Sequence, residues 1–341
     1  MKRAVHRLLK ALSEPDEHLD VIRSRQMMNL KALDPLKHLY RTLDTKIYNE
    51  GREVDFRIYF PCEESYEAID REHFMENHPE TAYRNMNDNT YPVLLFIHGG
   101  GFTTESVESY NKVCWNLAKH TKHVVVSIDY ELAPEQRFPR QVEDCYAVAK
   151  AVFTDRTILH VNPDEITIIG DSAGGNLAAA VCQMARERKE FMPARQILIY
   201  PCLNNDYSLN TPYRSVIENG TDYLLTRMNM EDYLNFYQSS IEDRKNPYFA
   251  PLMAADYHGL PKALIITGEF DPLRDEGEEY GRRLKDAGVF VTLHRIEDAV
   301  HGFFLLPPAY PAVRKTYEYI NDFLSEDGIG VSIEENQVAN T

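Results

Sequence analysis

A serine flanked by glycines lies where a strand pattern gives way to a helix pattern. The segment GDSAG (170–174) follows the apolar run 166–170 and precedes the helical pattern 176–190. Glycines on both sides let the backbone turn tightly enough to expose the hydroxyl, which is the geometry of a nucleophile elbow. A bare GxSxG also arises by chance, but here the strand and the helix that the motif requires are both present. We therefore predict that Ser172 is a catalytic nucleophile.

A serine hydroxyl is a weak nucleophile at neutral pH, so it needs a base and a third group that fixes the tautomer of that base. After a nucleophile elbow the acid comes first along the chain and the histidine second. Of the three downstream histidines, His294 lies inside the strand pattern 291–296 and His258 lies in a connector. His301 follows the strand beside Gly302, at the carboxyl edge of a parallel sheet, where open α/β folds keep their active sites. We predict His301 as the general base.

Asp271 is the best candidate for the third group. It follows ALIITGEF (263–270) and precedes Pro272, so it leaves the carboxyl end of a strand at the same edge of the sheet. Asp275 and Glu276 are close enough in sequence to compete. They fall at the start of the next helix, where acidic residues are ordinary. We predict that Asp271 orients the histidine.

A second glycine cluster, HGGG (98–101), follows the apolar run 93–97. Attack on a carbonyl puts negative charge on its oxygen, and each backbone N–H aimed at that oxygen can contribute ~3 kcal/mol. Glycines permit the close approach, and the motif is associated with lipases and esterases. Taken alone, a triple glycine is equally typical of a flexible loop or a phosphate cradle, although the missing Lys-Ser/Thr excludes a P-loop. We predict oxyanion-hole donors at Gly100, Gly101 and Ala173.

From residue 92 onward, short apolar runs alternate with helical segments. The runs are 93–97, 123–128, 166–170, 196–200, 263–267 and 291–296. Strands that are apolar on both faces and alternate with helices are typical of a parallel sheet covered on both sides. Before them, residues 54–60 alternate apolar with polar side chains, as in a half-buried strand, and Pro61 ends the pattern. These patterns predict an α/β fold with helices on both faces of a parallel sheet.

The chain is interpreted as five consecutive parts. They are an N-terminal helical part of a cap (1–44), a first part of the core (45–204), a cap insertion (205–246), a second part of the core (247–325) and a polar tail (326–341). The first part has apolar residues at helical spacing, among them Leu12 and Leu43, and predicts two or three short helices. Inside the core, residues 62–91 form a long polar excursion without an assigned role.

Composition limits the classes of partner. Thirty-seven basic and 53 acidic residues give a net charge of −16, which would repel a phosphate backbone or an anionic bilayer, so we expect no nucleic-acid partner and no membrane insertion. The first twenty residues lack a signal-peptide core, and no 18 apolar residues run together, which favours a cytoplasmic protein. The five cysteines form no CxxC pair, so we expect reduced thiols and no metal site.

Together these segments resemble the hormone-sensitive-lipase-like family of α/β-hydrolases, which includes many bacterial carboxylesterases. The resemblance is carried by HGGGF (98–102), DYELAPEQRFP (129–139), GDSAGGNLAAA (170–180), DPLRDEGEEYGRRLKDAG (271–288) and HGF (301–303), with a similar cap segment at 218–228. It implies an eight-stranded, mostly parallel sheet, a helical cap, and hydrolysis of short to medium acyl esters without a cofactor. It assigns the same roles to Ser172, Asp271 and His301. Dimers are common in the family, so a homodimer is possible, although no stripe of this sequence identifies an interface.

Two features have both a structural and a functional interpretation. The prolines of DYELAPEQRFP (129–139) make a rigid turn that its polar side chains can pin, and we favour this structural interpretation over a catalytic one. Aromatic residues of the predicted cap, Tyr233 among them, can line an acyl pocket or simply pack at helical spacing. As candidate substrate-binding residues we name Phe102, Tyr213 and Tyr223.

The sequence thus predicts a serine carboxylesterase whose partner is a small-molecule ester and which needs neither metal nor cofactor. An amidase or a deacetylase is an alternative, because the same triad serves these reactions and the pocket decides between them. A non-catalytic small-molecule receptor belongs to another class of function. It is disfavoured because a serine, an acid and a histidine are all present at the predicted triad positions.

Overall fold

The computed structural model describes residues 3–13, 18–31, 37–61, 92–155, 158–159 and 161–325. The predicted polar excursion (62–91) and the predicted tail (326–341) lie outside the described residues, as does Cys62. The fold, the triad candidates and the glycine loop lie within them.

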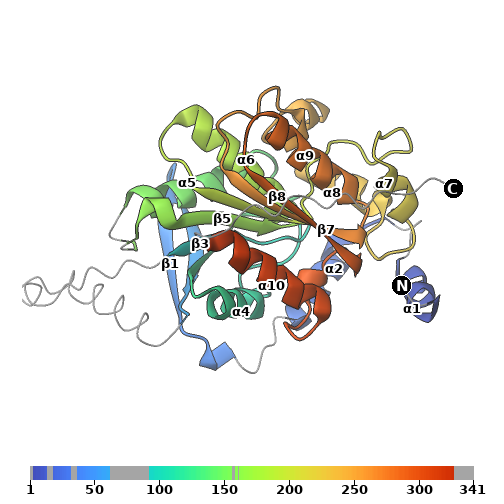
Figure 1. Ribbon diagram of the computed structural model, residues 1–341, viewed down its shortest axis with the longest axis horizontal. Helices are drawn as coiled ribbons and strands as arrows, with labels where there is room; N and C mark the ends of the chain where they lie inside the picture. The colour runs from blue at the N-terminus through green and yellow to red at the C-terminus, as the bar shows by residue number, and fades with distance from the viewer. Residues whose placement is uncertain are drawn as a thin grey trace, which may run out of the picture.

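Eight strands form the sheet at the centre of the protein (Figure 1). They are β1 (Thr42–Asn49), β2 (Arg52–Tyr59), β3 (Val93–Ile97), β4 (Val124–Asp129), β5 (Ile166–Asp171), β6 (Arg195–Ile199), β7 (Lys262–Phe270) and β8 (Val291–Val300). Their order across the sheet is β1-β2-β4-β3-β5-β6-β7-β8. The two pairs that involve β2 are antiparallel, and the other five pairs are parallel. The predicted eight-stranded, mostly parallel sheet is therefore confirmed.

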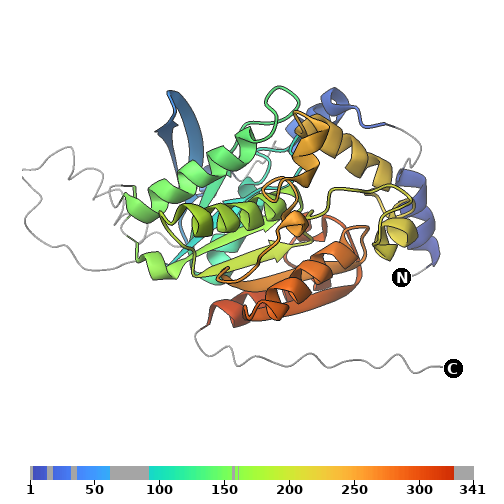
Figure 2. The same cartoon turned by 90° about the horizontal axis from the view of Figure 1, so that it is seen from above.

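Helices cover both faces of this sheet, as the sequence predicted (Figures 1 and 2). One face carries α5 (Arg140–Thr154), α6 (Ala173–Arg188) and α9 (Arg274–Asp286), and the other carries α4 (Asn111–Thr121) and α10 (Pro311–Leu324). Strand β3 shows how its apolar run serves both layers: Val93 and Leu95 pack with the α5 and α6 side, whereas Leu94 and Phe96 pack with the α4 and α10 side. Burial on both faces explains why such strands are continuously apolar.

The structure differs from the prediction at the end of the N-terminal part. Helical spacing predicts a helix that includes Leu43, but Leu43 lies in strand β1. A short 3-10 turn, η1 (Lys37–Leu39), ends before it, and Leu43 lies in the edge strand that pairs antiparallel with β2. Along β1, Leu43, Thr45 and Ile47 are half-buried and the residues between them are exposed. A half-buried edge strand has a weaker apolar signal than a central strand, so the preceding helical spacing dominated the pattern.

Helices from two distant parts of the sequence lie together beyond the carboxyl ends of the central strands (Figures 1 and 2). They are α1 (Arg3–Leu12) and α2 (Val21–Lys31) from the N-terminal part, and α7 (Arg214–Asn219) and α8 (Arg227–Tyr237) from the insertion. Lys10 Nζ donates to Asp222 (3.0 Å), and Asp232 accepts from the N–H of Leu19 (2.8 Å). The helical nature of both parts is confirmed, and their function as one cap stays a prediction.

The shorter 3-10 segments lie in connections. They are η3 (Pro163–Glu165) before β5, η4 (Ile241–Lys245) and η5 (Pro251–Met253) between α8 and β7, and η6 (Phe303–Leu305) after β8. The last of these follows directly on His301 and Gly302, so the loop that carries the predicted base is short and ordered into a turn.

Four cysteines lie in the described chain, and all four are free, buried thiols; they are Cys114, Cys145, Cys182 and Cys202. Burial raises the pKa of Cys114 to about 12, and it raises the pKa of the other three thiols as well. A thiol must ionise to act as a nucleophile, so these buried cysteines do not compete with a serine in this role.

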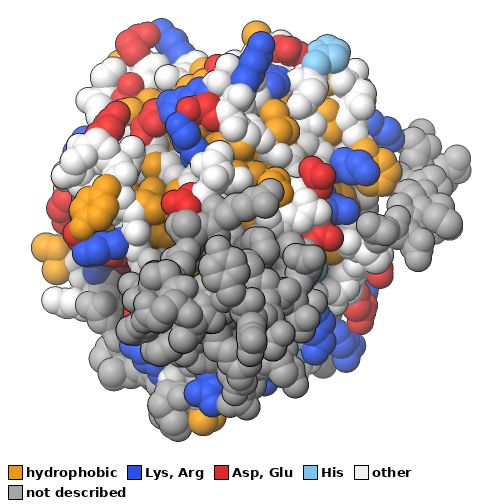
Figure 3. Space-filling view, turned by 90° about the vertical axis from the view of Figure 1, so that its left-hand side faces the viewer, with side chains coloured by type: hydrophobic (Ala, Val, Ile, Leu, Met, Phe, Trp, Pro, Cys, Tyr) orange, Lys and Arg blue, Asp and Glu red, His pale blue; other side chains and the backbone are white. Residues whose placement is uncertain are grey.

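The described surface mixes charges of both signs. On the coloured part of the face in Figure 3, basic and acidic side chains are interspersed, with smaller apolar areas between them. No helix within the described ranges is both long enough and apolar enough to cross a membrane.

Candidate active site

Ser172 lies at a sharp turn between β5 and α6. Its backbone has φ 54° and ψ −119°, and its N–H donates to the carbonyl of Ile199 (2.9 Å). The glycines around it have no room for a side chain: a Cβ on Gly170 would lie 2.2 Å from the carbonyl oxygen of Gly174, and one on Gly174 would lie 2.0 Å from that of Ile97. A strained φ of this kind persists because the surrounding packing enforces it, and such strain concentrates at functional sites.

His301 joins the serine to a buried acid. Its Nε2 lies 2.9 Å from Ser172 Oγ, and its Nδ1 lies 2.8 Å from Asp271 Oδ2. The Asp271 side chain is fully buried, and that of His301 is 12% exposed. Because a carboxylate only accepts hydrogen bonds, the neutral imidazole carries its proton on Nδ1, which leaves Nε2 free to accept from the serine hydroxyl. This arrangement can remove the serine proton.

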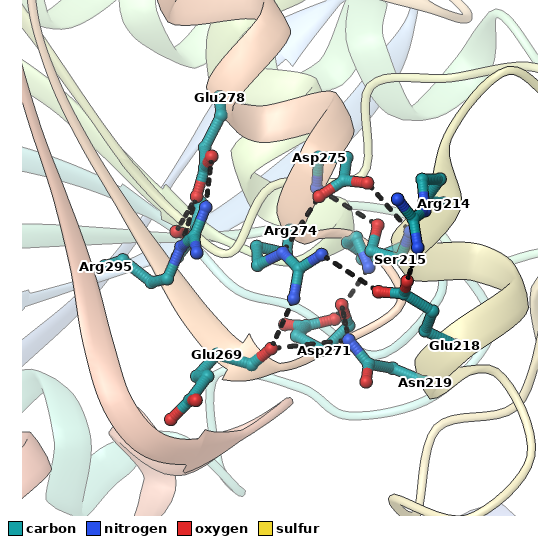
Figure 4. A network of polar contacts seen from close by, with 12 residues as sticks. Arg214, Ser215, Glu218, Asn219, Glu269, Asp271, Arg274, Asp275, Glu278 and Arg295 are labelled. Carbon is teal, nitrogen blue, oxygen red and sulfur yellow. Dashed lines mark hydrogen bonds and ion pairs between the residues drawn. The ribbon is translucent and has the colours of Figure 1, made fainter. Parts of the chain in front are cut away.

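The turn that carries Asp271 is held by α7 of the insertion (Figure 4). Asn219 Nδ2 donates to the carbonyls of Asp271 (3.2 Å) and Glu269 (3.3 Å), and Ser215 Oγ donates to the carbonyl of Pro272 (2.7 Å). Sequence reasoning missed Asn219 and Ser215. They lie about fifty residues before the acid, and no local pattern links two such distant segments.

The competing acids are engaged elsewhere. Asp275 accepts from the N–H of Ser215 (2.8 Å) and pairs with Arg274 (2.8 Å). Glu276 is buried and accepts from Tyr207 Oη (2.8 Å), and burial raises the pKa of Glu276 to about 8. Neither contact involves the imidazole of His301, so Asp271 is the acid that the structure brings to the histidine.

The competing histidines also have other partners. His258 is exposed and its Nδ1 pairs with Asp256 (2.6 Å). His294 lies in β8, where its ring stacks on Tyr319 with a centroid distance of 3.6 Å. Of the three downstream histidines, His301 is the one that contacts Ser172.

The glycine loop lies against the nucleophile elbow. Gly100 has φ 107° and Gly101 has φ 60°, a backbone region that other residues rarely adopt. A Cβ on Gly101 would lie 2.2 Å from the ring of Tyr233, so the loop is packed under α8. Ala173 is the first residue of α6, where a backbone N–H has no acceptor within the helix. The oxyanion role of these three N–H groups stays a prediction.

The segment DYELAPEQRFP (129–139) contacts the residue that precedes this glycine loop. Tyr130 Oη donates to the carbonyl of His98 (2.8 Å), and the rings of the two residues stack with centroids 4.3 Å apart. Arg25 of α2 donates to the carbonyl of Ala133 (2.8 Å) and to both carboxylate oxygens of Glu135 (2.7 and 2.8 Å). These contacts fit the structural interpretation, and Arg25 is a partner that the sequence did not indicate.

The three candidate substrate-binding residues have different surroundings. Phe102 is buried, and its ring stacks on Tyr237 with centroids 3.8 Å apart. Tyr213 is half-buried and directly precedes α7. Tyr223 stacks on Phe270 at the end of β7, with centroids 5.0 Å apart. A substrate-binding role for these residues stays a prediction.

The sheet, the serine elbow at its carboxyl edge and the histidine–acid pair define the class of protein as an α/β-hydrolase. Residues 94–305 match the model of a protein family whose description is alpha/beta hydrolase fold. The match covers more than half of the chain, so the chain belongs to this hormone-sensitive-lipase-like family. Within the part of the chain that the structure describes, no group of three or more His, Cys, Asp or Glu side chains could hold a metal ion.

Individual relatives are hydrolases. The carboxylic ester hydrolase LipN of Mycobacterium tuberculosis is 37% identical over 236 residues, which are 67% of this chain and 61% of LipN, so the chain spans less than two thirds of that relative. The arylacetamide deacetylase of Rattus norvegicus is 32% identical over 67% of this chain and 72% of its own. A solved esterase structure from Pyrobaculum calidifontis superposes with a TM-score of 0.78 at 34% identity, covering 95% of this chain and 98% of the other.

Proposed function

We propose that the protein is a serine carboxylesterase that hydrolyses short to medium acyl esters of small molecules. The observation that carries the proposal is the chain of hydrogen bonds from Ser172 through His301 to the buried Asp271, built on a nucleophile elbow. The ester hydrolases among the relatives support the same reaction class.

The reaction proceeds in two halves. Ser172 Oγ attacks the ester carbonyl carbon while His301 Nε2 takes its proton, and the N–H groups of Gly100, Gly101 and Ala173 bind the resulting oxyanion. The intermediate collapses, the alcohol leaves with the proton from His301, and an acyl-serine remains. Water then attacks the acyl carbon as His301 removes its proton. The acid departs, and the proton returns to Ser172.

Hydrolysis of a p-nitrophenyl ester series from acetate to laurate tests the proposal. We expect activity that falls by about a thousandfold or more in Ser172→Ala, the scale of triad losses elsewhere. Ser127→Ala is the matched control: Ser127 is a fully buried serine in β4, on the α4 side of the sheet, and its variant should keep wild-type kcat. The proposal fails if folded wild type hydrolyses none of the series, or if Ser172→Ala retains most of the activity.

Amide hydrolysis is a second candidate, favoured by the similarity to the arylacetamide deacetylase. The same triad can attack an amide, so a matched ester and anilide of one acyl group decide between the two. A higher kcat/KM on the anilide would make the protein an amidase, and stoichiometric ligand binding without turnover would make it a receptor. The cytoplasmic location, the absence of a cofactor and the possible homodimer stay predictions.

A further inference from the structure

A second buried acid directly precedes the proposed nucleophile and has no part in the reaction described above. Asp171 is the last residue of β5, and 1% of its surface is exposed. Burying a carboxylate costs free energy unless hydrogen bonds compensate it. The partners of Asp171 therefore indicate what the protein gains from keeping a carboxylate there.

Three donors from three segments converge on this carboxylate. Its Oδ1 accepts from the backbone N–H of Gly99 (2.9 Å). Its Oδ2 accepts from Tyr110 Oη (2.9 Å) and from Tyr200 Oη (3.3 Å). Gly99 belongs to the glycine loop, Tyr110 precedes α4, and Tyr200 follows β6. One side chain thus connects the serine strand with the glycine loop and with two further segments.

The contact with the glycine loop leaves no free space. A Cβ on Gly99 would lie 2.9 Å from Asp171 Oδ2 and 3.0 Å from Tyr110 Oη. The loop therefore lies directly on the carboxylate, and the next residues are Gly100 and Gly101, the proposed oxyanion donors. A shift of the carboxylate would move these donors relative to Ser172.

Tyr200 links Asp171 to His301, the proposed general base. The Tyr200 ring packs against the imidazole of His301, with centroids 4.7 Å apart, and against Phe303 (4.9 Å). Its backbone is fixed as well, since its N–H donates to the carbonyl of Ile266 (2.6 Å). The hydroxyl that donates to Asp171 thus belongs to the ring that packs against the imidazole of His301.

The backbone N–H of Gly99 can only donate, and both tyrosine hydroxyls donate to the carboxylate, so an ionised carboxylate, which only accepts, satisfies this arrangement. Burial raises the pKa of Asp171 to about 6, and the donors from Tyr110 and Gly99 oppose that rise. This pKa lies below neutral pH, and the three donors favour the ionised form. An asparagine would keep one acceptor oxygen for Gly99, but its NH₂ group would face the two tyrosine hydroxyls, which would then have to accept instead of donate, and the negative charge would be lost.

We propose that Asp171 is a positioning residue for ester hydrolysis. It holds the glycine loop, and the Tyr200 ring that packs against His301, in their places relative to Ser172. The inference rests on the proposed esterase function. It concerns the acid next to the nucleophile, which acts through the oxyanion loop and through Tyr200 without touching the substrate.

Asp171→Asn tests the proposal. A misplacement of about 1 Å can cost ~10²-fold in rate, so we expect kcat for p-nitrophenyl butyrate to fall 10- to 100-fold, with KM within about threefold of wild type. Affinity for a trifluoromethyl ketone, which forms a tetrahedral adduct with the serine, should fall in parallel with kcat. The control is Asp144→Asn, because Asp144 is also fully buried but pairs with Arg52 and accepts from the N–H of Glu131 (3.3 Å). Its variant should keep kcat.

An Asp171→Asn protein that melts like wild type and keeps kcat and ketone affinity would overturn the proposal. If this variant does not fold, Tyr110→Phe/Tyr200→Phe removes both hydroxyl donors and keeps both rings. An unchanged kcat in that double variant would overturn the proposal equally. Wild type is assayed in parallel, so inactivity of wild type refutes the esterase function, whereas active wild type with an equally active variant refutes only the role of Asp171.

Discussion

Replacing Asp271 with asparagine should nearly abolish activity without unfolding the protein. Asp271 uses its two oxygens differently: Oδ2 faces Nδ1 of His301 (2.8 Å), and Oδ1 accepts from the N–H of Leu273 (2.8 Å). An asparagine must keep its oxygen toward the N–H of Leu273, because its NH₂ group would face another donor there. Its NH₂ group therefore points at the imidazole, which must accept on Nδ1 and carry its proton on Nε2.

The wrong tautomer determines the size of the effect. A proton on Nε2 faces Ser172 Oγ at 2.9 Å, so the imidazole can no longer accept the serine proton. The equivalent substitution in a serine protease triad lowers kcat by ~10⁴-fold. This factor corresponds to about 5 kcal/mol of transition-state stabilisation. We expect a loss of ~10³- to 10⁴-fold for Asp271→Asn, with KM little changed.

The assay is kcat on p-nitrophenyl butyrate at pH 7.5, with thermal melting as a check on folding. Asp256→Asn is the matched control, because Asp256 also pairs with a histidine Nδ1 (His258, 2.6 Å) but lies exposed on the surface. The control should retain wild-type kcat. A folded Asp271→Asn variant that keeps more than a tenth of wild-type kcat would refute the assignment of the tautomer and of the acid.

Two further variants probe the glycine loop and a buried acid. Gly101→Ala should lower kcat at least about tenfold, because its Cβ would overlap the Tyr233 ring at 2.2 Å. The control is Gly259→Ala, which is also at positive φ but has open space around it and should keep wild-type kcat. Equal kcat in the two variants would contradict the packing argument. Glu276→Gln should flatten the pH dependence of stability. The pKa of Glu276 is raised from an ordinary 4.5 to about 8, so between these values the folded state binds more protons and the free energy of unfolding falls as pH rises. Melting temperatures from pH 5 to pH 9 test this, and a parallel decline in wild type and variant would contradict it.

The sheet and the three triad candidates could be predicted because their signals are local. A buried parallel strand is a continuous apolar run, and five of the six predicted runs agree with β3 to β7 to within a few residues. The exception in length is β8, which continues to Val300, close to the histidine loop. The serine elbow and His301 follow from glycines next to strand ends, which the sequence shows directly.

Contacts between distant segments could not be predicted. Tyr110 and Tyr200 meet on Asp171 from positions 61 and 29 residues away, and neither stands in a motif that implies the meeting. The orientation of α1 was also not predictable. Helical spacing predicts that helix, yet Leu8 and Leu12 are about 60% exposed, because polar contacts such as Lys10 to Asp222 fix the opposite face.

The most direct test of the central claim is covalent labelling with diethyl p-nitrophenyl phosphate, followed by intact-mass and peptide analysis. An esterase of the proposed mechanism should gain one diethylphosphoryl group per chain on Ser172, in proportion to the loss of ester hydrolysis, and Ser172→Ala should gain none. Full ester hydrolysis by unlabelled protein in excess reagent, or labelling confined to another residue as activity is lost, would contradict Ser172 as the nucleophile.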